Sequence, residues 1–334
     1  MTRNVDRSLL TKAKKNKNDE FYTQRVDIDK ELQHYQSKFR NKIVYCNTDN
    51  PLASNFVKYF IDNFSNLGLK RLIATGYAAN DGECGTYFSY TGSPDELAAY
   101  EAGNVQYLHG DGDFRSSECL SLLQESDIVV TNPPYSLLRE FISHMESFDK
   151  DFLIVATVNA ITYKDVFRLI HAGKIWLGVG LGRDISGFIV PEWYELYGTE
   201  ARINDRGERI VSTNNSLWLT TLDFERRHKD IPLVKTYKGN ESDYPHYDNL
   251  NGINISKTKD IPSDWFGLMG VPITSLHKHN PEQFEIVRFR KGDDGKDLRI
   301  NGKQPYFRII IKRKSGQSSD HQCNDAALSL RNSG

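Results

Sequence analysis

The stretch Asp127-Ile-Val-Val-Thr-Asn-Pro-Pro-Tyr-Ser136 decides the fold class, because it joins an apolar strand to a rigid turn and a helix. The same alternation of strand and helix surrounds it, and it is typical of a Rossmann-like, doubly wound α/β fold with a mostly parallel sheet. Such sheets bind ligands beyond the carboxyl ends of their strands. Further strands are predicted at 42–46, 71–75, 105–108 and 152–157, with helices at 27–39, 51–67, 116–124 and 136–148.

Four other segments depart from this rhythm. The stretch 76–103 is rich in Gly, Asp and Tyr and is predicted to be a surface excursion, and the glycines of 178–182 indicate a mobile loop. Beyond residue 172 short strand-like runs predict a more β-rich C-terminal region. The polar tail 315–334 lacks periodicity and is predicted to be disordered.

The composition is that of a globular protein: among 334 residues, 38% are hydrophobic and 26% are charged. No apolar run is long enough for a membrane span or a signal peptide, so we expect a cytoplasmic protein. The cysteines form no C-x-x-C pair and no disulfide framework, and His277-Lys278-His279 lacks partners at metal spacing, so no metal site is expected. The cysteines are Cys46, Cys84, Cys119 and Cys323.

The net charge of -1 is distributed unevenly. Residues 1–17 carry six basic side chains against one acidic one, and residues 286–314 carry ten against three. Two basic ends around an acidic body are suited to holding a polyanion such as DNA. Solvated termini without a partner explain the same charges equally well.

The turn Asn132-Pro133-Pro134-Tyr135 carries the clearest chemical signal. An amine conjugated with a π system is a poor nucleophile, and it improves when the Asn132 side-chain oxygen and the Pro133 carbonyl accept its two N–H bonds. Tyr135 would then stack on a flat substrate. This pattern indicates methylation of such an amine by S-adenosylmethionine, whether on adenine, cytosine, guanine or glutamine. A rigid turn without chemistry is the structural alternative.

Longer strings carry a family resemblance. They include DEFYTQ (19–24), GDGDFRSSE (110–118), DIVVTNPPYS (127–136), KIWLGV (174–179) and MGVPIT (269–274). On these strings the chain resembles the EcoRI-type adenine-specific DNA methyltransferases. The resemblance implies methyl transfer from S-adenosylmethionine to N6 of adenine in double-stranded DNA by base flipping, with GAATTC as the implied site. It also implies a monomer that works alongside a restriction endonuclease without binding it as a subunit.

The resemblance assigns cofactor and catalytic roles to residues of the strand ends. Asp49 would take the cofactor's amino group, in a turn that lacks the usual glycines. The ribose-binding acid is missing after the second strand, and Asp81 and Glu83 are the candidate substitutes. The catalytic residues are Asn132, Pro133, Pro134 and Tyr135, and the cofactor-binding residues are Phe21, Tyr22, Thr23, Cys46, Asn47, Asp49, Asp111, Asp113, Phe114 and Asn132.

DNA contacts are expected from the basic segments, and Trp218 either lines the base pocket or is half-buried in a strand. We predict three parts: a catalytic domain with a basic arm (1–222), a recognition region (223–314) and the tail (315–334). Two rival functions stay open at this point: a methyltransferase of RNA or protein glutamine, and an inactive DNA-binding protein. The DNA-binding candidates are Lys12, Lys14, Lys15, Trp218, Arg226, Arg227, Arg288, Arg290 and Lys291.

Overall fold

A computed structural model describes residues 21–78, 80, 82–192, 194, 196, 201–212, 214–290 and 297–314. The chain forms two compact units, which divide between Arg227 and His228. The predicted basic arm and the tail 315–334 lie outside the described residues. The assignment of DNA recognition to residues 223–314 stays a prediction.

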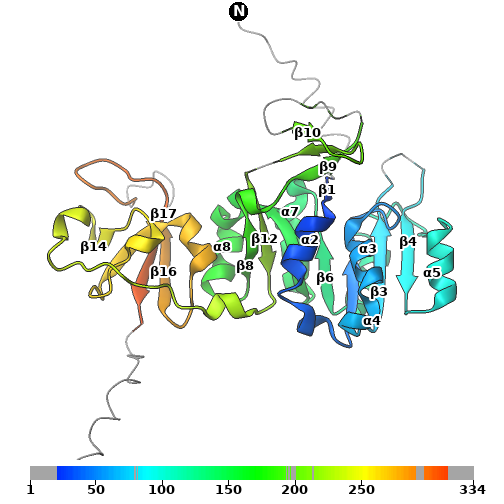
Figure 1. Ribbon diagram of the computed structural model, residues 1–334, viewed down its shortest axis with the longest axis horizontal. Coiled ribbons are helices and arrows are strands. Elements are labelled where there is room, and N and C mark those ends of the chain that lie inside the picture. The colour runs from blue at the N-terminus through cyan, green and yellow to red at the C-terminus, as the bar shows by residue number, and fades with distance from the viewer. Residues whose placement is uncertain are drawn as a thin grey trace, which may run out of the picture. The chain divides into compact units, whose positions relative to one another are not determined.

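Unit 1 is built on an eight-stranded sheet with the order β5-β4-β3-β2-β6-β7-β12-β8 (Figure 1). The four central strands are parallel, and the two strands at each edge are antiparallel to their neighbours. The predicted α/β fold class is confirmed. The strands are β2 (Ile43–Cys46), β3 (Arg71–Gly76), β4 (Thr86–Tyr90), β5 (Gln106–Tyr107), β6 (Ile128–Thr131), β7 (Asp151–Thr157), β8 (Trp176–Leu181) and β12 (Ser216–Thr220).

Helices cover both faces of this sheet, with α2 and α3 in front of it and α7 and α8 behind it in Figure 1. α3 begins after Ser54, whose hydroxyl accepts hydrogen bonds from Phe56 N and Val57 N. The helix predicted from residue 51 therefore starts later, and it breaks at Asn63 before it ends at Gly68, where φ is +62°. The helices are α2 (Arg25–Leu32), α3 (Asn55–Asp62), α4 (Phe64–Leu67), α5 (Pro94–Glu101), α6 (Ser117–Glu125), α7 (Leu138–Ser147) and α8 (Lys164–His171).

The segment 76–103 is not the predicted surface excursion. β4 pairs with β3 along its whole length, and α5 follows it. The reason is apolar burial: Phe88 and Tyr90 are 6% and 7% exposed, and the Tyr90 ring contacts that of Phe64 at a centroid distance of 4.8 Å. Side chains two residues apart point to the same face of a strand, so both rings reach the core.

The glycines of 178–182 also differ from the prediction, because β8 continues through Leu181. The buried Glu31 carboxylate accepts hydrogen bonds of 2.7 Å from the main-chain nitrogens of Val179 and Gly180. A side chain at Gly178 would collide with Glu31 and Trp218, so these glycines permit close packing. Burial raises the pKa of Glu31 to about 7, although these hydrogen bonds act in the opposite direction.

A second, antiparallel sheet of unit 1 has the order β1-β9-β11-β10. It lies above the main sheet in Figure 1. Its strands come from distant parts of the sequence, so it ties the start of the described chain to the region after α8. The strands are β1 (Tyr22–Thr23), β9 (Phe188–Val190), β10 (Ala201–Ile203) and β11 (Arg209–Val211).

Unit 2 contains a five-stranded sheet with the order β13-β14-β15-β17-β16. Tyr247, Leu298 and Ile310 form a buried cluster beside it. The C-terminal region is β-rich, as predicted. Its strands are β13 (His246–Tyr247), β14 (Leu250–Asn254), β15 (Leu268–Pro272), β16 (Phe284–Arg290) and β17 (Arg308–Arg313). The short 3-10 helices of both units are η1 (Gln36–Phe39), η2 (Tyr135–Leu137), η3 (Val158–Thr162), η4 (Gly182–Asp184), η5 (Glu225–His228), η6 (Glu241–Asp243), η7 (Thr258–Asp260) and η8 (Ile273–Lys278).

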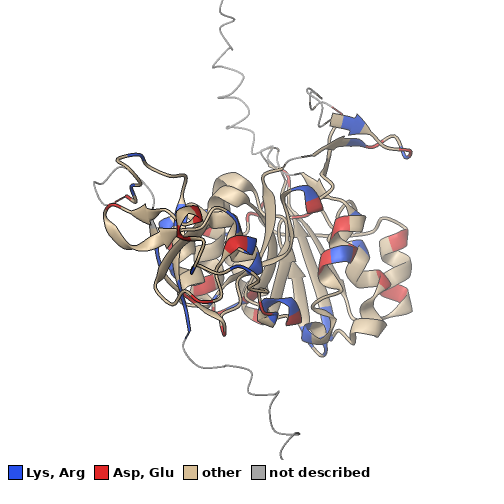
Figure 2. Ribbon diagram, turned by 60° about the vertical axis from the view of Figure 1, so that its left-hand side comes forward, with Lys and Arg blue, Asp and Glu red and all other residues tan. Residues whose placement is uncertain are grey.

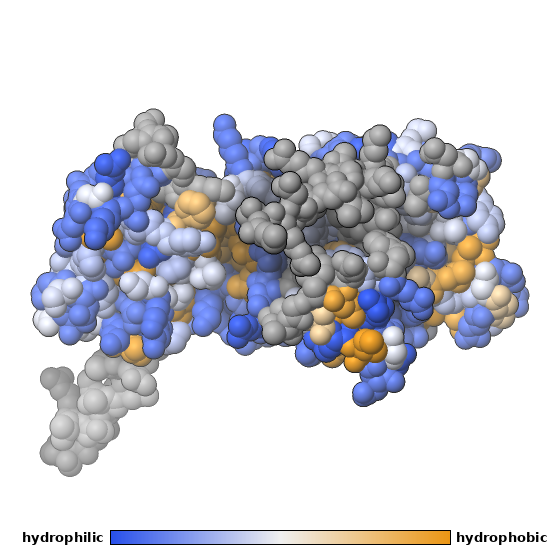
Figure 3. Space-filling view, turned by 90° about the horizontal axis from the view of Figure 1, so that it is seen from above, coloured by the Kyte–Doolittle hydropathy of each residue, from blue (hydrophilic) through white to orange (hydrophobic). Residues whose placement is uncertain are grey.

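Hydrophobic residues on the upper face form several separate groups (Figure 3). Among the described residues, no helix has the length and apolar character needed to cross a membrane.

Candidate active site

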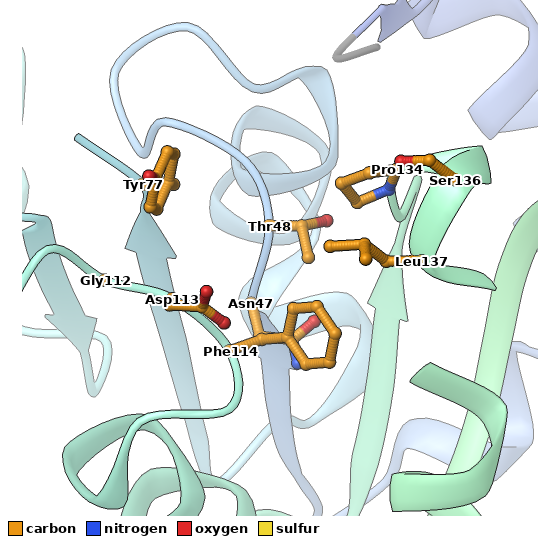
Figure 4. Close-up of a pocket in the computed structure, with 9 residues that line it drawn as sticks. All are labelled: Asn47, Thr48, Tyr77, Gly112, Asp113, Phe114, Pro134, Ser136 and Leu137. Carbon is orange, nitrogen blue, oxygen red and sulfur yellow. The ribbon is translucent and has the colours of Figure 1, made fainter. Parts of the chain in front are cut away.

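A pocket lies beyond the ends of the strands where the sequence predicted chemistry. Its walls come from the turns after β2, β3, β5 and β6. Figure 4 shows Asn47 and Thr48 between Asp113 and Phe114 on one side and Pro134 and Leu137 on the other. The lining residues are Asn47, Thr48, Tyr77, Gly112, Asp113, Phe114, Pro134, Ser136 and Leu137.

The turn 132–135 follows β6 beside this pocket. Asn132 is 7% exposed, and its side-chain nitrogen donates a hydrogen bond of 2.6 Å to the carbonyl oxygen of Phe21. Its side-chain oxygen Oδ1 is buried and has no hydrogen-bond partner among the described residues. A buried acceptor without a partner is costly for stability, so it indicates a ligand that donates a hydrogen bond to it.

Tyr135 is half-buried, and its hydroxyl makes a hydrogen bond of 3.1 Å with the hydroxyl of Ser216 at the start of β12. Burial raises the pKa of Tyr135 to about 12, although the bond to Ser216 acts in the opposite direction. The phenol therefore stays protonated at neutral pH, and the bond to Ser216 restricts the position of the ring.

Phe21 contacts Asn132 through its carbonyl oxygen, and the assignment of Phe21, Tyr22 and Thr23 to the cofactor stays a prediction. Tyr22 and Thr23 form β1 and pair with β9. The carbonyl of Thr23 accepts a hydrogen bond of 2.8 Å from the side chain of Asn55 in α3, and the hydroxyl of Thr23 is buried without a described partner. The ring of Phe21 contacts the ring of Tyr194 edge-on at 5.3 Å. These contacts hold the Phe21 carbonyl in place against Asn132.

The turn after β2 divides into lining residues and supporting residues. Asn47 lines the pocket with a buried, unpartnered side-chain oxygen. Thr48 also lines it and makes a hydrogen bond of 2.5 Å with the hydroxyl of Thr131. Cys46 is fully buried and does not line the pocket.

Asp49 has a different place from the one expected for a ligand of the cofactor's amino group. It is 5% exposed and does not line the pocket, and its carboxylate accepts a hydrogen bond of 3.2 Å from Thr131. Burial raises the pKa of Asp49 to about 7, although its hydrogen bonds to Thr131 and Ser54 act in the opposite direction. Asp49 thus links the turn after β2 to the end of β6 through this hydrogen bond.

Asp113 and Phe114 both line the pocket, whereas Asp111 does not. The Asp113 carboxylate forms a two-point ion pair with Arg115, at 2.5 Å and 2.8 Å. The Phe114 ring packs on that of Phe141 at 5.3 Å. Asp111 accepts a hydrogen bond from the main-chain nitrogen of Asp113 and so shapes the turn.

Glycines that the sequence analysis did not single out bring the neighbouring turns together. A side chain at Gly112, where φ is +81°, would lie 2.5 Å from the carbonyl oxygen of Gly76 and 3.2 Å from the Cα atom of Gly85. Tyr77, directly after Gly76, lines the pocket where an acidic residue was expected. Tyr77 and Gly112 follow β3 and β5, and this position after a strand was the sequence signal that could have identified them.

Of the two substitutes proposed for the ribose-binding acid, Glu83 does not line the pocket. Glu83 is exposed and accepts a hydrogen bond of 2.9 Å from the side chain of Asn80. Asp81 lies outside the described residues.

Trp218 does not fit the predicted base pocket. Its side chain is 1% exposed, and its ring contacts that of Phe56 in α3 at 6.0 Å, because the apolar ring fills the core between β12 and the helix. A side chain so enclosed has no surface for DNA.

The remaining DNA-binding candidates that the structure describes belong to both units. Arg226 is exposed, and Arg227 lies over the ring of Trp176 at 4.4 Å. Arg288 is half-buried in β16, and Arg290 ends the same strand. Lys12, Lys14, Lys15 and Lys291 lie outside the described residues.

Comparison with known proteins identifies the family. The profile of the family described as "Adenine-specific methyltransferase EcoRI" matches residues 9–314. The chain belongs to this family. It is 59% identical to the Type II methyltransferase M.EcoRI of Escherichia coli, over 94% of this chain and 99% of that protein. The identification as an EcoRI-type adenine-specific DNA methyltransferase is therefore confirmed.

Two mycoplasma proteins are more distant relatives. M.MgeORF184P of Mycoplasma genitalium is 34% identical and M.MpnI of Mycoplasma pneumoniae is 32% identical, each over 91% of this chain and 98% of the relative. Both are named Type II methyltransferases. No solved structure gives a significant match.

Proposed function

We propose that this methyltransferase moves the methyl group of S-adenosylmethionine to N6 of adenine in duplex DNA, after the adenine has left the base stack. The observation that carries the proposal is the buried, unpartnered Oδ1 of Asn132, whose amide nitrogen is held by Phe21. The bond from one N–H to Phe21 fixes the orientation of the amide, and in that orientation its buried oxygen is available to a ligand. That polarity suits an N–H donor such as the adenine amino group.

The proposed chemistry needs two acceptors and no metal. Asn132 Oδ1 and the Pro133 carbonyl accept the two N–H bonds, so that the N6 lone pair points toward the incoming methyl group. The N6–carbon bond forms as the carbon–sulfur bond breaks, and the extra proton on N6 leaves to water. The described residues contain no group of three or more His, Cys, Asp or Glu side chains able to hold a metal ion.

The pocket suits S-adenosylmethionine, which supplies a methyl group activated by its positive sulfonium. Asn47 has a buried side-chain oxygen without a partner among the described residues, which could accept a hydrogen bond from a hydroxyl or amino group of the cofactor. Phe114 offers an apolar ring to the adenine of the cofactor. Asp113 retains acceptor capacity beside its ion pair, because an ionised carboxylate has about four acceptor positions. These residues support binding of the adenosine end, and the family resemblance assigns Phe21, Tyr22 and Thr23 to the methionine end.

Adenine N6 is inside the double helix, so the nucleotide must rotate out before it can reach Asn132. Stacking on Tyr135 would compensate part of the lost base stacking. The identity to M.EcoRI supports GAATTC as the site. We also propose cytoplasmic localisation, where DNA and S-adenosylmethionine occur, and action as a monomer beside an independent restriction endonuclease.

The test compares Asn132→Ala and Asn132→Asp with Asn104→Ala, a control at an exposed position away from the pocket. Methyl transfer to a GAATTC duplex and binding of S-adenosylhomocysteine are measured separately. Asn132→Ala should abolish transfer and retain binding, Asn132→Asp should keep partial transfer, and the control should match the wild type. Normal transfer by Asn132→Ala, or parallel loss of transfer and binding, would contradict the role of Asn132.

The substrate class is tested with the wild-type protein. A GAATTC duplex, the corresponding RNA and a glutamine-containing peptide are offered with labelled cofactor. Methyl transfer to DNA alone is expected. Transfer to RNA or peptide alone would support the first rival function, and failure to bind the cofactor would support the inactive DNA-binding protein.

A further inference from the structure

The β10–β11 hairpin is an exposed element that the proposed reaction has not used. Ile203 in β10 is 62% exposed, and β10 is the outer strand of the small sheet. The hairpin projects from the body of unit 1, with basic residues along it (Figure 2). Natural edge strands generally avoid exposed apolar side chains because these promote aggregation. Ile203 therefore points to a partner that covers it.

The hairpin is connected to the catalytic turn through the small sheet. Three strand spacings of about 4.8 Å separate β10 from β1, which places the two strands about 14 Å apart. Cross-strand pairing puts Ile203, Arg209 and Phe188 on one face of this sheet. The ring of Phe188 lies 6.4 Å from that of Phe21, whose carbonyl holds Asn132. Ile203 thus lies on the face of the sheet that reaches toward the catalytic turn.

The turn of the hairpin is internally braced. The side-chain oxygen of Asn204 accepts hydrogen bonds from the main-chain nitrogens of Arg206 and Glu208, at 3.0 Å and 2.9 Å. Its side-chain nitrogen donates to the Glu208 carboxylate at 2.7 Å, and Gly207 supplies a φ of +77°. A braced element loses little conformational freedom when it binds a partner.

The dimensions and charge of the hairpin fit duplex DNA. A two-stranded ribbon fits the major groove, which is about 12 Å wide. Three arginines lie along the hairpin, and one of its two acidic side chains, Glu208, is engaged by Asn204. Arg206 and Ile203 are both exposed. An exposed cation beside an exposed apolar side chain suits contact with a phosphate and with the bases next to it.

We infer that the β10–β11 hairpin enters the DNA groove at the target site and that Ile203 inserts into the base stack beside the flipped adenine. This inference rests on the proposed function. Removing a base from the stack costs a few kcal/mol, and an apolar side chain wedged between base steps compensates part of that cost with new contacts. Ile203 is a positioning residue in this account, since it acts through the DNA and does not touch the reacting atoms.

The experiment uses Ile203→Ala in the full-length protein, with Val26→Ala as the matched control. Val26 is 46% exposed on α2 in the same unit. Each variant methylates two GAATTC duplexes, one with the target adenine opposite thymine and one with it opposite an abasic site. The abasic partner leaves the adenine unpaired, so its extrusion needs less help.

On the paired duplex Ile203→Ala should be slower than the wild type by about tenfold, equivalent to about 1.4 kcal/mol. On the abasic duplex Ile203→Ala should approach the wild-type rate. Ile203→Leu keeps a large apolar side chain, so it should methylate both duplexes at about the wild-type rate. A weaker rise in 2-aminopurine fluorescence at the target position should accompany the slow rate. An unchanged rate, or an equal loss on both duplexes, would overturn the inference. If the wild type methylates neither duplex, the proposed function itself fails.

Discussion

The hydroxyl of Tyr135 and the hydroxyl of Ser216 lie 3.1 Å apart, so the half-buried tyrosine that ends the turn 132–135 is fixed to the first residue of β12. The two residues are 81 positions apart in sequence. The contact restricts the ring that we propose to stack on the flipped adenine, and it gives the phenol oxygen a structural role distinct from catalysis.

Tyr135→Phe should slow methyl transfer by about fivefold, because one hydrogen bond contributes about 1 kcal/mol while the aromatic face remains. Tyr135→Ala should slow it by about ten- to a hundredfold, since stacking contributes roughly 1–3 kcal/mol. Single-turnover methylation of a GAATTC duplex measures both. Ser216→Ala should resemble Tyr135→Phe. Equal damage from Tyr135→Phe and Tyr135→Ala would contradict the stacking role.

Gly112→Ala should destabilise the protein by more than about 1 kcal/mol and weaken cofactor binding, because φ is +81° and the new side chain would meet the Gly76 carbonyl at 2.5 Å. Gly103→Ala is the matched control: its φ is +78°, and nothing lies within 4 Å of an added side chain. Urea unfolding and titration with S-adenosylhomocysteine measure the two effects. If both variants lose the same stability, backbone strain alone explains the effect and the predicted collision with the Gly76 carbonyl is contradicted.

Glu31 should make stability depend on pH. Burial raises its pKa from the ordinary value of 4.5 to about 7, so the folded protein keeps a proton that the unfolded chain releases. The stabilisation that Glu31 contributes to the folded state is fully present below about pH 4.5 and is lost as the pH rises to about 7. Over this range the free energy of unfolding falls by at most about 1.4 kcal/mol per pH unit.

Glu31→Gln lacks this ionisation and should show a flatter dependence of the unfolding free energy on pH between 5 and 8. It should also be less stable than the wild type at pH 5, because the glutamine nitrogen faces a main-chain donor of Val179 or Gly180. Urea unfolding at four pH values measures the slopes. Parallel curves for the two proteins would exclude Glu31 as the group responsible.

DNA binding should weaken steeply with salt, and removal of residues 1–17 should reduce the slope of log Kd against log salt concentration. The segment has six basic residues and one acidic residue, and each phosphate contact releases counterions. The segment lies outside the described residues, so its charge alone motivates the prediction. An unchanged slope after truncation would exclude it from the DNA interface.

Local sequence signals predicted the central strands and the turn that follows β6. Apolar runs such as 127–131 belong to strands buried on both faces, and the alternation of strand and helix indicates that the strands are mostly parallel. The strand ends therefore identified Asn47, Asp113 and Phe114 as candidates, and these residues do line one pocket.

Long-range contacts account for what the sequence did not reveal. The glycines of β8 resemble a loop until Glu31, about 150 positions earlier, is placed against them. Asp49 stands at a sequence position typical of a cofactor-binding residue, yet it is hydrogen-bonded to Thr131 and does not line the pocket. Neither contact leaves a local periodic pattern.

The hydrogen bond that orients the Asn132 side chain depends on a main-chain atom, since its acceptor is the carbonyl oxygen of Phe21. Every amino acid has such a carbonyl, so a substitution that keeps the ring contacts with Phe188 and Tyr194 can preserve this hydrogen bond. The spacing along the chain is not free in the same way. Insertion or deletion of one residue between Phe21 and α2 would present a different carbonyl, or none, and we expect related enzymes to tolerate substitutions here but not changes in length.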